Sequence, residues 1–200
     1  MGKKKAEQMI RRLYNWTISL AQTPYALWAL AVVSFVESSV FPIPPDVLMI
    51  PMIIARPSRA WVIAGVALVA SVLGGLFGYF IGAILYDAVG LPILEFYGKT
   101  EAAEAFKGRF NEWGAWAVLI AGMTPFPYKV ITILSGTTGL SLPVFILSSI
   151  IARGLRFFIV AALLWKFGAP IRTFIEKRLG LLFAVFLVLL IGGFYLVKYL

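Results

Sequence analysis

Residues 35–53 read FVESSVFPIPPDVLMIPMI and place two carboxylates and four prolines inside an otherwise apolar run. Proline lacks a backbone N–H and has a fixed φ, so the proline cluster at the centre of this run forbids a continuous helix. In hydrocarbon, broken backbone persists only where protein buries it or where it lines a wet cavity. An intramembrane carboxylate is by default a functional-site hypothesis. We therefore predict a re-entrant helical hairpin that carries Glu37 and Asp46.

The composition places the chain in a lipid bilayer. Of its 200 residues, 61% are hydrophobic and 14% are charged, and the mean hydropathy is +0.92. Several apolar runs are long enough to cross a membrane. The net charge of +9 comes from short basic clusters that flank the apolar runs. This distribution is typical of the loops of a membrane protein, so the charge does not indicate nucleic-acid binding. Cysteine and histidine are both absent from the sequence, so we expect no disulfide, no metal and no cofactor.

The pattern of apolar and basic residues divides the chain into three regions. Residues 1–24 combine basic residues with apolar positions at helical spacing, which is typical of an amphipathic helix on the cytoplasmic side. A secretory signal is the competing interpretation, but the small-residue cleavage site is missing. Residues 25–179 form the membrane domain, with hairpins at about 25–59 and 113–142. Residues 180–200 are expected to form a last transmembrane helix.

Two full membrane spans are expected at residues 60–86 and 143–167. In the first span, Gly74, Gly78 and Gly82 repeat every four residues and leave a smooth ridge for close helix contact. Such a ridge predicts packing inside the bundle rather than a dimer face.

The longest polar segment, residues 87–112, separates the first full span from the second interrupted region. Its acidic excess favours the non-cytoplasmic side of the membrane. Aromatic residues within it are spaced so that one face can lie on the membrane surface. A plain solvated loop is the alternative interpretation.

Residues 113–140 read WGAWAVLIAGMTPFPYKVITILSGTTGL and are again broken into arms too short to span. At an offset of 83 residues, Asp46 of the first hairpin matches Lys129 of the second. Proline-broken segments at matching places in two halves indicate a transporter's binding site. The prolines expected to break the hairpins are Pro42, Pro44, Pro45, Pro125 and Pro127.

One full span separates the hairpins, so they should enter the membrane from opposite faces. The predicted fold is therefore all-α: a polytopic helical membrane protein with two re-entrant helical hairpins in an inverted repeat. Hairpins of this kind would meet near the midplane. The sequence thus predicts that Asp46 and Lys129 lie together there as a buried ion pair.

Five charged residues are expected inside the membrane. Arg153 and Arg156 lie near the centre of the second full span and, three residues apart, share one helical face. Together with Lys129 they outnumber the carboxylates of Glu37 and Asp46. The excess positive charge suits an anion such as a lipid phosphate, which arginine's planar fork binds through two oxygens. The carboxylates can carry protons. Charges that only pair to hold the hairpins together are the alternative.

Three stretches carry a family resemblance: FVESSVFPIPPD, TPFPYKVITILSG and ARGLRFF. Together they resemble the DedA family, also called SNARE-associated Golgi or VTT-domain proteins, and within it the YqaA-like branch. The likeness covers roughly residues 25–170. It implies a polytopic protein with two re-entrant hairpins that moves phospholipids or polyprenyl-phosphate carriers between leaflets.

The resemblance also assigns roles to particular residues. Glu37 and Asp46 match the family's acidic positions. Many members carry two arginines that bracket a proline in the second hairpin, whereas Met123 and Lys129 occupy the nearest places here. The resemblance therefore implies a basic, lipid-phosphate-binding role at Lys129. Arg153 and Arg156 would supply the missing positive charge.

The predicted function is non-enzymatic: a lipid transporter or flippase, coupled to protons, that moves a phospholipid or polyprenyl phosphate between leaflets. An uncoupled scramblase or a structural membrane-organising factor is the alternative. A lipid-phosphate enzyme is less favoured, because neither a histidine nucleophile nor a metal cluster can be assembled. We expect a multi-pass protein of the cytoplasmic (inner) membrane with a cytoplasmic N-terminus. Its expected partners are the lipid and protons but no nucleic acid, and homo-oligomerisation is left open.

The predicted topology can be tested with single cysteines at Gly2, Thr100 and Thr173 of this cysteine-free chain. Basic clusters favour the cytoplasm, so we expect a membrane-impermeant thiol reagent to label only the Thr100 variant from outside. Labelling of the Thr173 variant from outside would overturn the inverted-repeat topology.

Overall fold

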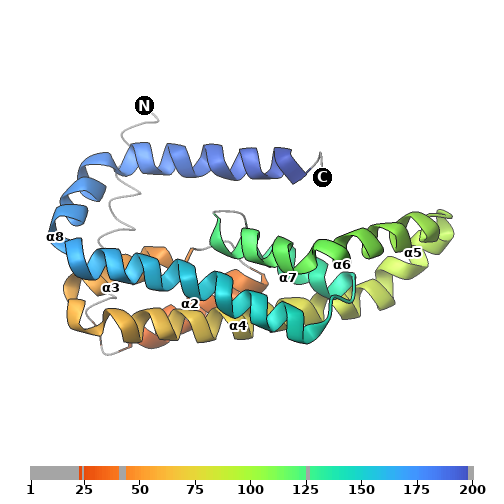
Figure 1. Cartoon of the computed structure of the whole chain (residues 1–200), viewed down its shortest axis with the longest axis horizontal. Coiled ribbons are helices and arrows are strands. Elements are labelled where there is room, and N and C mark those ends of the chain that lie inside the picture. The colour runs from red at the N-terminus through yellow and green to blue at the C-terminus, as the bar shows by residue number, and fades with distance from the viewer. Residues whose placement is uncertain (1–22, 24, 41–43, 125–126, 198–200) are drawn as a thin grey trace.

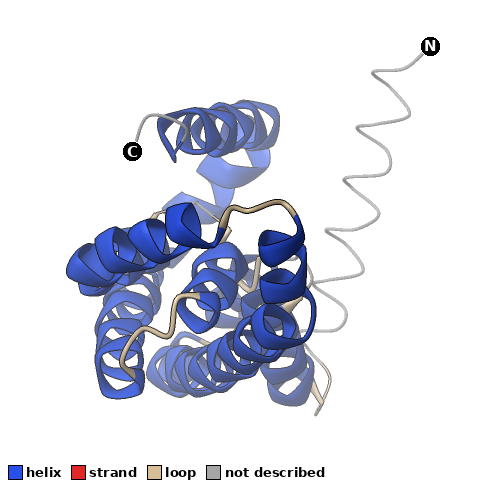
Figure 2. Ribbon diagram, turned by 90° about the vertical axis from the view of Figure 1, so that its right-hand side faces the viewer, coloured by secondary structure: helices blue, strands red, loops and turns tan. Residues whose placement is uncertain are grey.

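The computed structural model describes residue 23 and residues 25–40, 44–124 and 127–197, with side chains as far as residue 168 and at Pro170. Every element in these residues is helical (Figures 1 and 2), so the predicted all-α class is confirmed. The helices are α2 Ala26–Ser39, α3 Asp46–Ala55, η1 Pro57–Arg59, α4 Ala60–Leu85, the π-helix η2 Tyr86–Gly90, α5 Leu91–Phe96, α6 Thr100–Met123, α7 Tyr128–Thr137 and α8 Leu142–Val197. The amphipathic helix predicted for residues 1–24 lies, apart from Thr23, outside the described residues.

The first hairpin consists of α2 and α3, with 14 and 10 residues. Both are shorter than the roughly 20 residues that a spanning helix needs. A helix begins again at the end of the proline cluster: Pro45 is the N-cap of α3, Pro44 lies just before it, and Pro51 lies inside the helix. Asp46 occupies the first turn, where its negative charge complements the helix dipole. Pro42 lies outside the described residues.

The second hairpin consists of α6 and α7, with 24 and 10 residues. Pro127 is the N-cap of α7 and has an extended backbone conformation. Pro125 lies outside the described residues. The expectation of two short arms is wrong for α6, which begins at Thr100. The alternative of a solvated loop for residues 87–112 is likewise wrong where α6 begins. The alanine, glutamate and lysine residues that follow Thr100 are strong helix formers.

Helix α4 is the centre of the bundle and packs against α2, α7 and α8. A Cβ added at Gly74 would lie 2.1 Å from the carbonyl oxygen of Phe35 in α2, and one at Gly82 would lie 2.0 Å from that of Ile133 in α7. The predicted glycine ridge inside the bundle is therefore confirmed. It also shows that α2 approaches α4 most closely near the middle of α4, at Gly74, and that α7 does so nearer its end, at Gly82.

The packing partners follow the relation that an inverted repeat requires. In the first half, α2 packs on α4 and α3 packs on α8. In the second half, α6 packs on α8 and α7 packs on α4. Exchanging α2 with α6, α3 with α7 and α4 with α8 therefore interchanges these four packings. This two-fold relation is the usual architecture of transporters built around a central site.

Two stretches of the described chain are long and apolar enough to cross a membrane: Pro57–Phe96 and Leu142–Gly168. They contain the two predicted full spans. Beyond these residues α8 contains Pro170, and its C-terminal part turns and runs back above the bundle (Figure 1). Proline is an ordinary cause of such a change of direction. A last span within residues 180–200 stays a prediction.

Two glycines of α4 provide a matched test of the close helix contacts. Gly82→Ala should lower stability by about 1–3 kcal/mol, because its methyl group would overlap the backbone of α7. Gly65→Ala meets nothing within 4 Å and should be neutral or up to about 1 kcal/mol more stable through helix propensity. Thermal unfolding in detergent measures both. Equal melting temperatures for the two variants would refute the packing of α7 on α4.

Candidate functional site

Arg153 of α8 is the largest fully buried side chain in the described residues, with 1% of its area exposed. Its Nη2 lies 2.6 Å from Oε2 of Glu37, near the end of α2, and its Nε donates to Oγ of Ser71 in α4 at 2.6 Å. The guanidinium also lies over the rings of Tyr128 and Phe157, 4.7 and 4.8 Å from their centroids. One cation thus joins α2, α4, α7 and α8.

Hydroxyl groups extend this buried network. The Oγ atoms of Ser38 and Ser71 lie 2.7 Å apart, and Ser38 donates to Glu37 at 3.2 Å. Thr132 of α7 donates to the carbonyl oxygen of Ser38 at 3.0 Å. The hydrogen bonds made by the ionised Arg153 and Glu37 are charge-assisted, and such bonds offset the large free-energy cost of burying an ion. Sequence reasoning missed these serines, although polar residues inside predicted apolar helices were the available signal.

Arg156 lies one turn further along α8 and makes a second ion pair. Its Nη2 is 2.6 Å from Oδ2 of Asp46, in the first turn of α3. Its Nη1 donates to the carbonyl oxygen of Thr124, at the end of α6, at 3.0 Å. A single guanidinium therefore binds the inner ends of both hairpins.

The two ion pairs differ in their access. The side chains of Arg156 and Asp46 are 20% and 19% exposed, against 1% for Arg153. Arg156 and Asp46 also line a cavity of about 320 Å³, whose other walls are Met123, Ile159 and Val160. Arg153 is enclosed by protein, although its partner Glu37 is 13% exposed, whereas both members of the second pair can be reached by another molecule.

Lys129 is not the partner of Asp46, so that predicted ion pair is wrong. Its Nζ instead donates to the carbonyl oxygen of Val40, just past the end of α2, at 3.4 Å. The internal repeat located Asp46 and Lys129 near the two hairpin tips but did not show that Arg156 lies against Asp46. Within the described part of the chain, Lys129 has no acidic partner.

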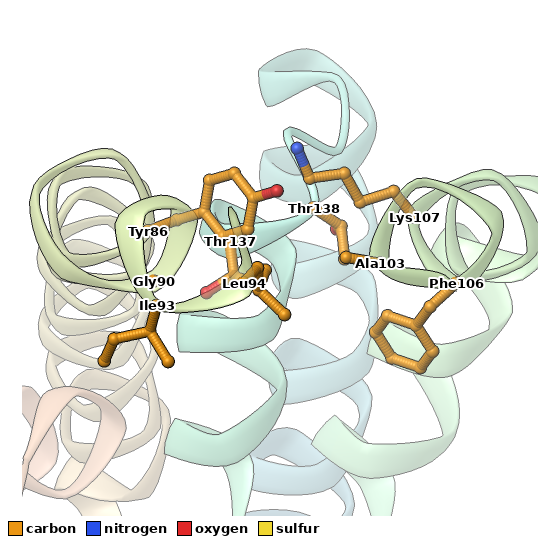
Figure 3. Close-up of a pocket in the computed structure, with 9 residues that line it drawn as sticks. All are labelled: Tyr86, Gly90, Ile93, Leu94, Ala103, Phe106, Lys107, Thr137 and Thr138. Atoms are coloured by element: carbon orange, nitrogen blue, oxygen red, sulfur yellow. The ribbon is translucent and has the colours of Figure 1, made fainter. Parts of the chain in front are cut away.

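A larger cavity of about 380 Å³ lies between η2, α5, α6 and the end of α7 (Figure 3). Apolar side chains form most of it, and the Nζ of Lys107 lies 3.8 Å from the centroid of the Tyr86 ring. The charge of Lys107 is paired with Glu104 at 3.0 Å. None of the residues predicted for the site lines this cavity. The candidate site is therefore the region around the two ion pairs, Arg153–Glu37 and Arg156–Asp46.

Comparisons with known proteins agree with this architecture. The family model of the VTT domain matches residues 43–166. An uncharacterized protein from Haemophilus influenzae is 36% identical over 168 residues, which cover 82% of this chain and 87% of that protein. An uncharacterized protein from Histophilus somni is 39% identical over 168 residues with the same coverage. No solved structure matches the chain significantly.

The chain therefore belongs to the VTT-domain family, whose domain is that of the DedA proteins. The family consists of membrane-associated proteins to which transport roles are ascribed, and it is not known for enzymatic activity.

A double-mutant cycle tests the observed pairing. Asp46→Asn and Arg156→Gln should show a coupling energy of about 0.5–3 kcal/mol, because each loses the same contact. Asp46→Asn and Lys129→Met should instead be additive. Melting temperatures in detergent for the singles and doubles give both values. Coupling to Lys129 rather than to Arg156 would contradict the geometry of the site.

Proposed function

We propose that this protein moves a phosphate-bearing lipid, a phospholipid or polyprenyl phosphate, between the leaflets of the cytoplasmic (inner) membrane, and that movement is coupled to protons. In this proposal the N-terminus is cytoplasmic and Arg156 binds the lipid phosphate. The observation that carries the proposal is the Asp46–Arg156 pair, which lines a cavity where the two hairpin tips meet.

The chemistry of the cavity supports a lipid head group as the ligand. The guanidinium of Arg156 is a planar fork that can bind two phosphate oxygens. Met123, Ile159 and Val160 provide apolar walls for the first carbon atoms of the lipid. A cavity of about 320 Å³ is at the small end of ligand pockets, so it suits a head group while the lipid tails stay in the bilayer.

Competition for Arg156 would link lipid binding to protons. A phosphate bound to Arg156 takes the place of the carboxylate of Asp46, 2.6 Å away. The displaced carboxylate then lies beside another negative charge without its counter-ion, which favours proton binding. Lipid loading and proton loading would therefore occur together. Glu37, 13% exposed, is proposed as a second proton-binding group.

The other cations would act around this step. Arg153 is held by Glu37 and Ser71, and we propose that it contributes positive potential while fixing α8 against α2 and α4. Lys129 spans from α7 to the carbonyl oxygen of Val40, so it can add a further contact to a phosphate when the hairpin tips separate. Rocking of one half against the other would expose the cavity to each leaflet in turn.

Lipid movement in proteoliposomes tests the proposal. Arg156→Gln should lower the rate about tenfold or more, because a charged hydrogen bond contributes about 1.5–3 kcal/mol. Arg156→Lys should rescue it only in part, since lysine keeps the charge but loses the fork. Arg109→Gln removes the same charge from an exposed position of α6 and should have no effect.

Collapsing the proton gradient should slow the wild-type protein. Movement that persists unchanged would indicate an uncoupled scramblase. A full rate in Arg156→Gln would remove this residue from the lipid path.

A further inference from the structure

Arg56 and Arg59 converge on a small hollow at the outer end of the first hairpin. Arg56 follows the end of α3 and Arg59 precedes α4, and both side chains are exposed. They line a cavity of about 60 Å³ between the starts of α2 and α4, whose other lining residues are Thr23, Ala26, Leu27, Met52 and Ile63. No acidic residue of the described chain pairs with either guanidinium.

The position of this hollow corresponds to the level of lipid phosphates. Ser71, which bonds Arg153, marks the level of the ion pairs on α4. At a rise of 1.5 Å per residue, Arg59 lies about 18 Å away along the helix axis. Half the hydrocarbon thickness of a bilayer is about 15 Å. With the hairpin tips at the bilayer centre, Arg56 and Arg59 lie just beyond the hydrocarbon boundary.

Size and chemistry limit what the hollow can hold. A volume of about 60 Å³ equals roughly two water molecules in the liquid, which is too small for an acyl chain. Two guanidiniums with no acidic partner among the described residues, above an apolar floor of Met52 and Ile63, favour a compact oxyanion. Arginine prefers phosphate because its fork matches two oxygens at once.

We propose that Arg56 and Arg59 form a second phosphate-binding site, for the head group of an anionic lipid at the membrane surface. This site is separate from the cavity of Arg156. Its role rests on the proposed function: it would hold a lipid in the leaflet at which the first hairpin enters, before the lipid reaches Arg156. Binding itself does not require transport and can be measured independently.

The experiment measures binding of phosphatidic acid to the purified full-length protein in detergent. An Arg156→Gln background removes the inner phosphate ligand, so that the remaining binding reports the outer site. In this background, Arg56→Gln with Arg59→Gln should raise the Kd about tenfold or more, which is the effect of losing charged hydrogen bonds. Arg109→Gln, with the same charge change on α6, should leave the Kd unchanged.

Three results would overturn the site. Unchanged binding in the Arg56→Gln, Arg59→Gln variant would remove both residues from it. If replacing both arginines by lysine left the Kd unchanged, charge alone would attract the lipid. The proposed site requires a Kd between that of the parent and that of the glutamine variant. Competition by inorganic phosphate as strong as by phosphatidic acid would show that free phosphate is the ligand. Because both side chains are exposed, the variants should keep the parent's melting temperature.

The two proposals fail in different ways. Loss of surface binding with normal lipid movement would refute only the outer site. Normal surface binding without lipid movement in the wild-type protein would refute only the proposed transport. In transport assays, the Arg56→Gln, Arg59→Gln variant should need more lipid to reach half its maximal rate, with the maximal rate retained.

Discussion

The burial of Arg153 is the constraint on which the rest of the bundle depends. A guanidinium with 1% exposure is tolerated only if other groups pair with it and bond it. Glu37 supplies the opposite charge and Ser71 supplies an acceptor, so α2, α4 and α8 must approach closely at this level. Gly74 allows that approach, because a side chain there would overlap the backbone of α2.

The two ion pairs use the same chemistry for different purposes. Both acidic residues come from the first hairpin and both arginines from α8, so each pair holds the two halves of the repeat together. Arg153 is enclosed and supported by hydroxyl groups, which fixes α8 against α2 and α4. The pair of Arg156 opens into a cavity and reaches both hairpin tips. A ligand can therefore compete for the second pair without disturbing the first.

Much of the fold could be predicted from local sequence patterns. Prolines in apolar runs indicated both hairpins, apolar length indicated the two full spans, and the spacing of Gly74, Gly78 and Gly82 indicated a buried ridge. The start of α6 was missed, because its first residues are polar and hydropathy alone does not predict a helix there. The candidate charges were also identified, since ionisable residues inside apolar runs are conspicuous.

The sequence by itself therefore determined the breaks, the spans and the set of intramembrane charges, because each depends on residues close together along the chain. Only the tertiary structure decided which charges meet. Asp46 lies 110 residues from Arg156, and the matching repeat position of Lys129 gave no information about how α8 lies against the hairpins. Pairing across such distances depends on helix rotation and packing, which local periodicity does not specify. The same packing decided that Arg153 is closed off while Arg156 is accessible.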